Sequence, residues 1–494
     1  MLNIKKILEV SEDSIITGIP EGYDGVVLNR IVQEGKTVVF VARDDRRMAT
    51  IDASLEFFAG EVEVVHFPAW DCLPYDRVSP KNDIIAARVD ALTKLADLND
   101  SQPRIILTSV AAILQRVPAC KILRGSTLVF GNGGETLREI LITYLQNNGY
   151  GRSETVMEPG EYAIRGGIVD VYPPGFREPL RLDFFGDELD SIRTFEPFSQ
   201  RTSGGCDSFV LKPYNEISLD KSSISRFRSG YRALFGAISD DDLLYDAISE
   251  GRTHTGMEHW LPLFHEEMDT LLSYVKNCIV ISDHQLEEAV ISRWELICEC
   301  YNARSDMKDR GLSVSETTYN PLPVNKLYLS LEEMNAFFSD FKQIKFQQFA
   351  VSSDPSNILD AGGRPGFNFA EARALPDVNV YDALRDYIKN ANKDGRSIII
   401  GAFSEGSADR LLGLLKRNNI FASTDPTSQL CLAVLKLDSG FIAPGLELIT
   451  EQDILGDRLS SPRRRKIRPE NFIAETSVLS AGDLVVHMDH GIGR

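Results

Sequence analysis

The stretch "TVVFVAR" (Thr37–Arg43) decides the fold class, because it is apolar at nearly every position. A short run of this kind is typical of a strand buried on both faces of a parallel sheet. The residues that follow place Met48, Ile51 and Leu55 three and four positions apart, which predicts a helix with one buried face. A strand followed by such a helix is the building unit of an α/β domain.

Outward from this unit, the alternation of strand and helix patterns continues. "VEVVHF" (Val62–Phe67) and "RIILTSV" (Arg104–Val110) predict two more strands. The pattern changes near Phe130, and from Glu158 to Phe209 the signals are short strands separated by Gly and Pro. We therefore expect a parallel-sheet α/β domain that is interrupted by an inserted α+β domain.

Beyond the insert, helical patterns return, and a second α/β pattern surrounds "RSIIIGAF" (Arg396–Phe403). "SPRRRKIRPE" (Ser461–Glu470) is a Pro-flanked basic run without periodicity, which is typical of a linker. The strand-rich end of the chain stops before it could close a core, so we expect a piece of a longer protein. The predicted parts are 1–125 with 212–340 (α/β), 126–211 (inserted α+β), 344–455 (second, smaller α/β), 456–478 (basic linker) and 479–494 (start of a further strand-rich domain).

Charge and composition exclude several classes of protein. The 72 acidic and 53 basic residues give a formal net charge of -19, which disfavours indiscriminate binding to nucleic acids. The 7 cysteines show no paired spacing, and His487 and His490 lack further ligands, so we predict neither disulfides nor a metal site. No apolar run reaches the ~18 residues of a membrane helix, and the start lacks a signal peptide's apolar region. We expect a cytoplasmic protein that binds no membrane.

Two stretches could suggest a nucleotide-binding loop, and neither has the required chemistry. "EGKT" (Glu34–Thr37) leads into a strand instead of a helix, and Arg30 stands where the motif needs glycine. "TGIPEGYDG" (Thr17–Gly25) lies between a strand and a helix pattern but lacks a lysine, and Glu21 and Asp24 would repel a triphosphate. We therefore predict no catalytic residue and no cofactor in this chain.

In the insert, the stretch "PLRLDFF" alternates between the two faces of a predicted strand. Leu180, Leu182 and Phe184 share an apolar face that fits the core of the insert. Arg181 and Phe185 then point outward. An exposed aromatic beside arginines is typical of a protein-binding hot spot, because a guanidinium can pair bidentately with a carboxylate of the partner.

Arg165 could join this surface from a neighbouring strand. It stands directly before Gly166-Gly167, which predicts a tight turn or a bulge. In the alternative interpretation, Phe185 packs against another domain of this chain, and the arginines form surface salt bridges worth ~0–1 kcal/mol. The residues by themselves leave both interpretations open.

Five stretches resemble the bacterial transcription-repair coupling factors, in the order in which they occur in that family. They are "FPAWDCLPYDRVSP" (Phe67–Pro80), "LTSVAAILQRVP" (Leu107–Pro118), "EPGEYAIRGGIVDVYPPG" (Glu158–Gly175), "RLDFFGDELDSIRTFEPFSQRT" (Arg181–Thr202) and "GMEHWLPLF" (Gly256–Phe264). The terminal "GDLVVHMDHGIGR" resembles the start of the family's RNA-polymerase-binding domain. The resemblance covers essentially the whole chain.

This resemblance implies an N-terminal region similar to the repair protein UvrB, with a degenerate nucleotide site and an inserted domain that binds the damage-recognition protein UvrA. The residues that match the family's UvrA-binding residues are Arg165, Arg181 and Phe185. It also implies a second α/β domain and then a β-barrel-like domain that binds the β subunit of RNA polymerase.

In the full-length family, two motor domains use ATP and Mg to translocate on double-stranded DNA, and a C-terminal domain covers the UvrA-binding surface. This chain lacks the motors, so we expect a UvrA-recruiting fragment without enzyme activity or a cofactor of its own. Two alternatives remain open. One is a nucleotide-binding enzyme of the helicase-like α/β class, and the other is a nucleic-acid or polymerase adaptor that uses the basic run Arg463–Arg468.

Overall fold

The computed structural model describes residues 4–9, 13–97, 102–131, 138–239, 242–309, 319–349, 357–425, 427–456, 485–487 and 491–493. The chain forms two compact units. The first comprises Met1–Gly366 with Ser439–Glu447, and the second comprises Phe367–Asp438 with Leu448–Arg494.

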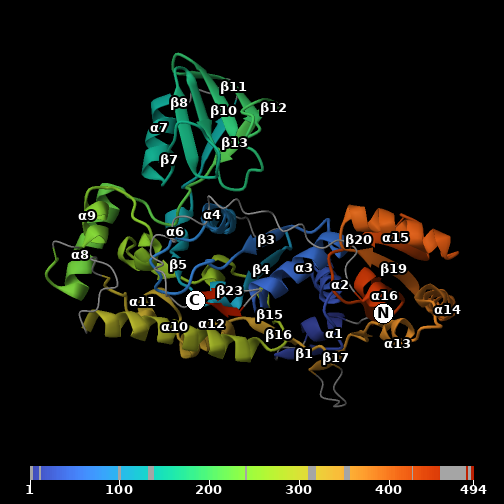
Figure 1. Cartoon of the computed structure of the whole chain (residues 1–494). Coiled ribbons are helices and arrows are strands. Elements are labelled where there is room, and N and C mark those ends of the chain that lie inside the picture. The colour runs from blue at the N-terminus through green and yellow to red at the C-terminus, as the bar shows by residue number, and fades with distance from the viewer. Residues whose placement is uncertain are drawn as a thin grey trace. The chain divides into compact units, whose positions relative to one another are not determined.

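A parallel sheet is the centre of the first unit (Figure 1). Among the described residues it has seven strands in the order β17-β1-β16-β15-β2-β4-β3. Their bounds are β1 Ser14–Thr17, β2 Thr37–Ala42, β3 Val64–Phe67, β4 Ile105–Ser109, β15 Cys278–Ser282, β16 Lys342–Phe346 and β17 Ile358–Asp360. Every adjacent pair runs parallel. The α/β fold class predicted from "TVVFVAR" is therefore confirmed.

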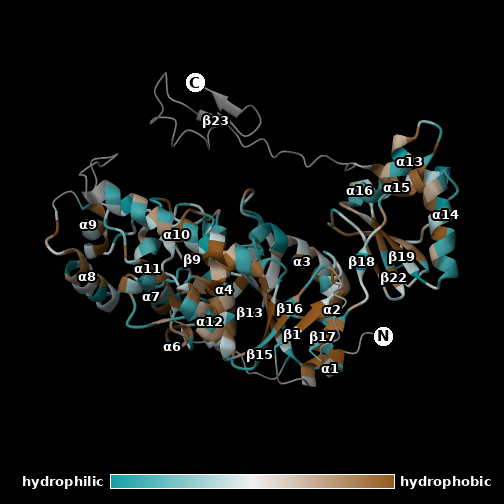
Figure 2. Ribbon diagram, turned by 90° about the horizontal axis from the view of Figure 1, so that it is seen from below, coloured by the Kyte–Doolittle hydropathy of each residue, from teal (hydrophilic) through white to brown (hydrophobic). Residues whose placement is uncertain are grey.

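The central strands form because their residues are apolar on both faces. All of β4 is buried, and so is β2 from Val38 onward. Figure 2 shows hydrophobic residues along β1 and β16 of the same sheet. The helices that follow the first strands are α2 (Asp24–Gln33), α3 (Asp45–Phe58) and α4 (Asn82–Asp97), and α10 (Leu286–Asp309) follows β15.

Two strands lie in a different sheet from the one that their sequence position indicates. β16 and β17 belong largely to the predicted 344–455 domain, but β16 pairs with β15 and β1, and β17 pairs with β1. Phe346 packs its ring 5.7 Å from that of Phe40, inside the first core. A short apolar run predicts a buried strand but carries no information about which sheet it joins, so this boundary follows from packing.

The stretch "EGKT" is a helix-to-strand turn, as predicted. α2 ends at Gln33, Gly35 has a φ of +81°, and β2 begins at Thr37. A left-handed residue after a helix is favourable for glycine because it has no Cβ.

The insert contains an almost entirely antiparallel sheet of its own, visible beside α7 in Figure 1. Among the described residues it has six strands in the order β12-β11-β10-β9-β8-β7. They are β7 Gly151–Arg152, β8 Glu161–Arg165, β9 Ile168–Val171, β10 Leu180–Phe185, β11 Glu188–Phe195 and β12 Thr202–Cys206, with α7 at Arg138–Asn147. Leu141 and Leu145 of α7 share one core cluster with Val169 and Leu182 of the sheet. One face of the sheet is therefore its inner face, against α7.

The insert is anchored on α4 by apolar and charged contacts. Ile85 and Ala86 of α4 belong to the core cluster of the insert. The Nζ atom of Lys212, after the last insert strand, lies 2.5 Å from a carboxylate oxygen of Asp90. Burial would raise the pKa of Asp90, but Lys212 and Lys94 hold it below its usual value.

The second unit contains the parallel pair β19 (Ser397–Ala402) and β20 (Leu430–Val434). The helices α14 (Val380–Lys393) and α15 (Glu405–Arg417) bury Leu384, Ile388, Leu411 and Leu415 in a common core with the strands. This agrees with the α/β pattern around "RSIIIGAF". The basic run Arg463–Arg468 and His490 lie outside the described residues.

At the C-terminus, β23 (Val485–His487) and β24 (Gly491–Gly493) form an antiparallel pair. Across the chain as described, no helix is long and apolar enough to cross a membrane.

Candidate partner-binding surface

The β8–β9 hairpin carries Arg165 and turns at Gly166-Gly167, as predicted. Arg165 pairs with Ile168 across the turn, and Gly166 has a φ of +61°. The oxygen of Gly167 accepts from the N–H of Phe184 at 2.9 Å, and a Cβ on Gly167 would lie 2.7 Å from the oxygen of Phe184. The first glycine is needed for its backbone conformation and the second for this close approach.

The alternation predicted for β10 is confirmed. Leu180, Leu182 and Phe184 are buried on the inner face, whereas Phe185 is 86% exposed. Phe185 pairs with Glu188 across the next turn. We call the face opposite α7, which carries Phe185, the outer face.

The register of three strands brings the three predicted residues onto the outer face. Arg165 pairs with Ile168, and Ile168 pairs with Asp183 of β10. Directly paired residues share a face, and so do residues two apart in one strand, which adds Arg181 and Phe185. The outer face therefore presents Arg165 and Phe185 at the turn end and Arg181 toward the opposite end of β10.

Arg181 lies on the predicted face, but its guanidinium already has a carboxylate partner. Its Nε and Nη2 atoms donate to the two carboxylate oxygens of Asp170 at 2.7 and 2.9 Å. The side chain of Asp170 is 1% exposed, and that of Arg181 is 16% exposed. The hydrogen bonds that Arg181 donates to Asp170 raise the pKa of Arg181. A bidentate pair is thus formed within this chain, whereas the prediction paired Arg181 with a carboxylate of the partner, and Asp170 is a site residue that sequence reasoning missed.

The segment around Arg181 closes this part of the outer face. Its guanidinium lies 4.5 Å from the ring centroid of Phe195, and its Nη1 atom donates to the oxygen of Gln200 at 3.3 Å. Phe195 packs with Val156 and Ala163 in a small core of its own. Arg181 therefore stabilises the outer face more than it offers a free charge.

Arg165 differs, because it is exposed and donates to uncharged acceptors. Its Nη2 atom donates to the backbone carbonyl oxygen of Glu154 at 2.7 Å and to the hydroxyl of Thr155 at 3.2 Å. Within the described ranges, no carboxylate forms an ion pair with it. Arg165 and Phe185 together make the open end of the outer face, where a guanidinium and an aromatic ring remain accessible.

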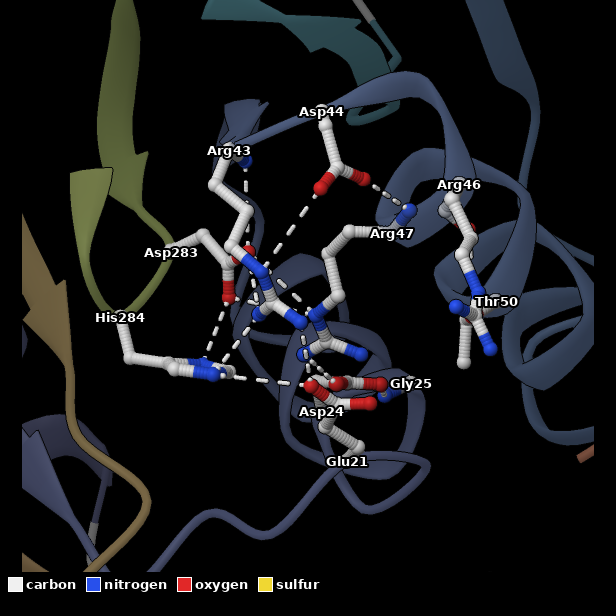
Figure 3. Close-up of polar contacts among 10 residues, drawn as sticks. All are labelled: Glu21, Asp24, Gly25, Arg43, Asp44, Arg46, Arg47, Thr50, Asp283 and His284. Atoms are coloured by element: carbon white, nitrogen blue, oxygen red, sulfur yellow. Dashed lines mark hydrogen bonds and ion pairs between the residues drawn. The ribbon is translucent and has the colours of Figure 1, made fainter. Parts of the chain in front are cut away.

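The loop "TGIPEGYDG" has the position of a phosphate-binding loop, but its own carboxylate occupies the helix terminus (Figure 3). Asp24 is fully buried in the first turn of α2 and accepts from the N–H of Gly25 at 2.8 Å. Its other oxygen forms an ion pair with Arg47. A helix N-terminus attracts anions. Here the anion is a side chain of the loop itself.

Further charged groups complete this cluster, which sequence reasoning did not identify (Figure 3). Arg47 Nε lies 3.3 Å from both oxygens of Asp283, and Arg43 Nη2 donates to Glu21 at 2.7 Å. The Nη1 atom of Arg43 lies 2.7 Å from Nε2 of His284. Although burial would raise the pKa of Asp283, His284 and the two arginines hold it below its usual value. Arg43 Nε also lies 3.9 Å from a carboxylate oxygen of Asp44, so the two arginines face four carboxylates.

Comparison with known proteins agrees with these observations. Residues 128–216, the insert, match the UvrB interaction domain. The transcription-repair-coupling factor of Escherichia coli (strain K12) is 32% identical over 477 residues, which cover 92% of this chain and 39% of that protein. This chain matches the N-terminal part of the transcription-repair-coupling factors.

Two further relatives of the same name extend the match. The factor of Haemophilus influenzae is 29% identical over 506 residues, covering 98% of this chain and 42% of the relative. The factor of Bacillus subtilis (strain 168) is 26% identical over 539 residues, covering 100% and 44%. The chain therefore spans about two fifths of the length of the curated relatives it matches, and the resemblance stated from its motifs is confirmed.

Proposed function

We propose that this chain recruits UvrA through the outer face of the insert, as the N-terminal part of a transcription-repair coupling factor. The observation that carries the proposal is the open end of that face, where Phe185 is 86% exposed and Arg165, two strands away on the same face, is also exposed. Arg165 and Phe185 would contact UvrA directly. Arg181 would hold the strands that present them, through its pair with Asp170.

The physical argument rests on what each group gains from a partner. Burying a phenylalanine side chain contributes ~1.5–3 kcal/mol. A guanidinium with free donors can form a bidentate pair with a partner carboxylate, which is about twice as strong as a neutral hydrogen bond. Aromatic residues and arginine are also the residue types enriched at binding hot spots.

The wider role belongs to the full-length protein. There, a polymerase-binding domain would engage the β subunit of a stalled RNA polymerase. Motor domains that depend on ATP and Mg would translocate on DNA and displace the stalled polymerase. UvrA recruitment would then start nucleotide excision repair in the cytoplasm. We expect the 494 residues of this chain to use no cofactor, and the two carboxylates of the loop "TGIPEGYDG", Glu21 and Asp24, support this for nucleotides.

The test is affinity for immobilised UvrA, measured for the chain and for Phe185→Ala. We expect a loss of about 2 kcal/mol, which is roughly a 30-fold rise in Kd. Phe421 in the second unit is 73% exposed and supplies the matched control, Phe421→Ala, which should bind as the unchanged chain does. Equal affinities for the three proteins would contradict the proposal.

A further inference from the structure

A second aromatic residue is exposed beyond the other end of β11. Phe198 is 85% exposed, almost as much as Phe185. It lies in the segment between β11, which ends at Phe195, and β12, which begins at Thr202. Single exposed apolar side chains are common on protein surfaces, so the exposure of Phe198 does not by itself indicate a site, whereas its position on the insert does.

The loop that carries Phe198 is held in one conformation. The carboxylate of Glu196 accepts from the N–H of Phe198 at 3.1 Å and from the N–H of Ser199 at 2.5 Å. Interactions with Ser199, through its side chain first and its N–H second, lower the pKa of Glu196, and the N–H of Phe198 contributes less. The N–H of Glu196 also donates to the oxygen of Arg201 at 2.9 Å, which closes the loop. A side chain on an ordered loop loses less conformational entropy when it binds.

The loop lies against the outer face. The oxygen of Gln200 accepts from Arg181, whose side chain is on that face. The side-chain amide of Gln200 donates to the oxygen of Val156 at 3.1 Å, and Val156 packs with Phe195 over the same end of the sheet. The loop that carries Phe198 therefore lies at the closed end of the face whose open end carries Phe185.

We propose that Phe198 is a second contact for the partner that binds Arg165 and Phe185, an inference that rests on the proposed function. The eight residues of β11 separate the two ends. At about 3.4 Å a residue, this spacing is ~24 Å. A standard interface covers about 800 Å² on each partner and is thus roughly 30 Å across, so one partner surface reaches both rings. That surface must offer two apolar pockets ~24 Å apart, with acidic groups facing Arg165.

The experiment measures Kd for UvrA with Phe198→Ala, Phe185→Ala, the double variant and the Phe421→Ala control, all in the full 494-residue chain. We expect about a tenfold rise in Kd for Phe198→Ala. The double variant should show the product of the two single effects, because the sites lie too far apart to couple. Thermal unfolding of Phe198→Ala should match that of the unchanged chain, since the removed ring is exposed.

The outcomes separate this inference from the proposed function. A weakened Phe185→Ala with an unchanged Phe198→Ala would overturn the second contact and leave the proposed function standing. Unchanged affinity in both variants would overturn both. Sedimentation of each protein without UvrA tests whether the Phe198 ring instead contacts a second copy of the chain. If Phe198→Ala changes self-association and leaves UvrA affinity unchanged, the ring contacts a second copy of the chain and the proposal is wrong.

Discussion

The buried cluster behind the loop "TGIPEGYDG" and the open end of the outer face both use arginines, with opposite results. In the cluster, Arg47 and Asp24 are almost completely buried and pair with each other. At the open end, Arg165 is exposed and donates to a backbone carbonyl oxygen and to a hydroxyl, both uncharged. The residue types are similar, but the buried arginine is already paired and stabilises the fold, whereas the exposed arginine can still bind a carboxylate of a partner.

Arg181 shows the intermediate case. It shares a face with Phe185, yet its fork is occupied by the buried Asp170. An arginine on the right face of a strand is therefore not yet a binding residue. Its availability depends on whether a carboxylate lies within reach on the neighbouring strand.

The largest loss of stability should come from breaking the buried ion pair between Arg47 and Asp24. Asp24→Ala leaves Arg47 buried without this partner, and removing one member of a buried pair costs about 3–5 kcal/mol. Urea unfolding of the first unit should show the loss. Glu267→Ala removes one member of the exposed pair with Lys121 and should cost less than about 1 kcal/mol. If the two variants lose equal stability, the buried pair stabilises the first unit no more than an exposed pair does, and this interpretation of the cluster is wrong.

A second buried group should make stability depend on pH. Burial lowers the pKa of His259 to about 4. The unfolded chain takes up the proton near pH 6.5, whereas the folded chain does so near pH 4. Stability should therefore be fully present above pH 6.5 and fall between pH 6.5 and 4, by up to ~3 kcal/mol. His259→Gln should flatten this slope, and an unchanged slope would assign it to other groups.

The smallest effects distinguish the two outer-face arginines. Arg181→Ala leaves the buried carboxylate of Asp170 without its partner and should cost about 1–3 kcal/mol of stability. Arg165→Ala should change stability by less than about 0.5 kcal/mol, but it should weaken UvrA binding on the order of tenfold. Both variants are measured by denaturation and by UvrA binding. If Arg165→Ala unfolds more easily than Arg181→Ala, the structural role belongs to Arg165 and the assignment is reversed.

Much of the surface could be predicted because strand periodicity is local. Alternation in "PLRLDFF" put Phe185 on the outer face, and Gly166-Gly167 marked the turn after Arg165. Both follow from backbone geometry that a few neighbouring residues specify. For the same reason, "TVVFVAR" was enough to predict a buried parallel strand.

What a residue touches across strands depends on register and packing, which short patterns do not encode. Asp170 meets Arg181 because β9 and β10 pair in one register, and Asp24 meets Arg47 because α2 and α3 pack together. β16 joins the first sheet because its pairing partners β15 and β1 lie there. The amino-acid sequence thus specified which side chains face outward and that the fold is α/β. The folded chain specified which charges are already paired, because that depends on residues brought together from distant segments.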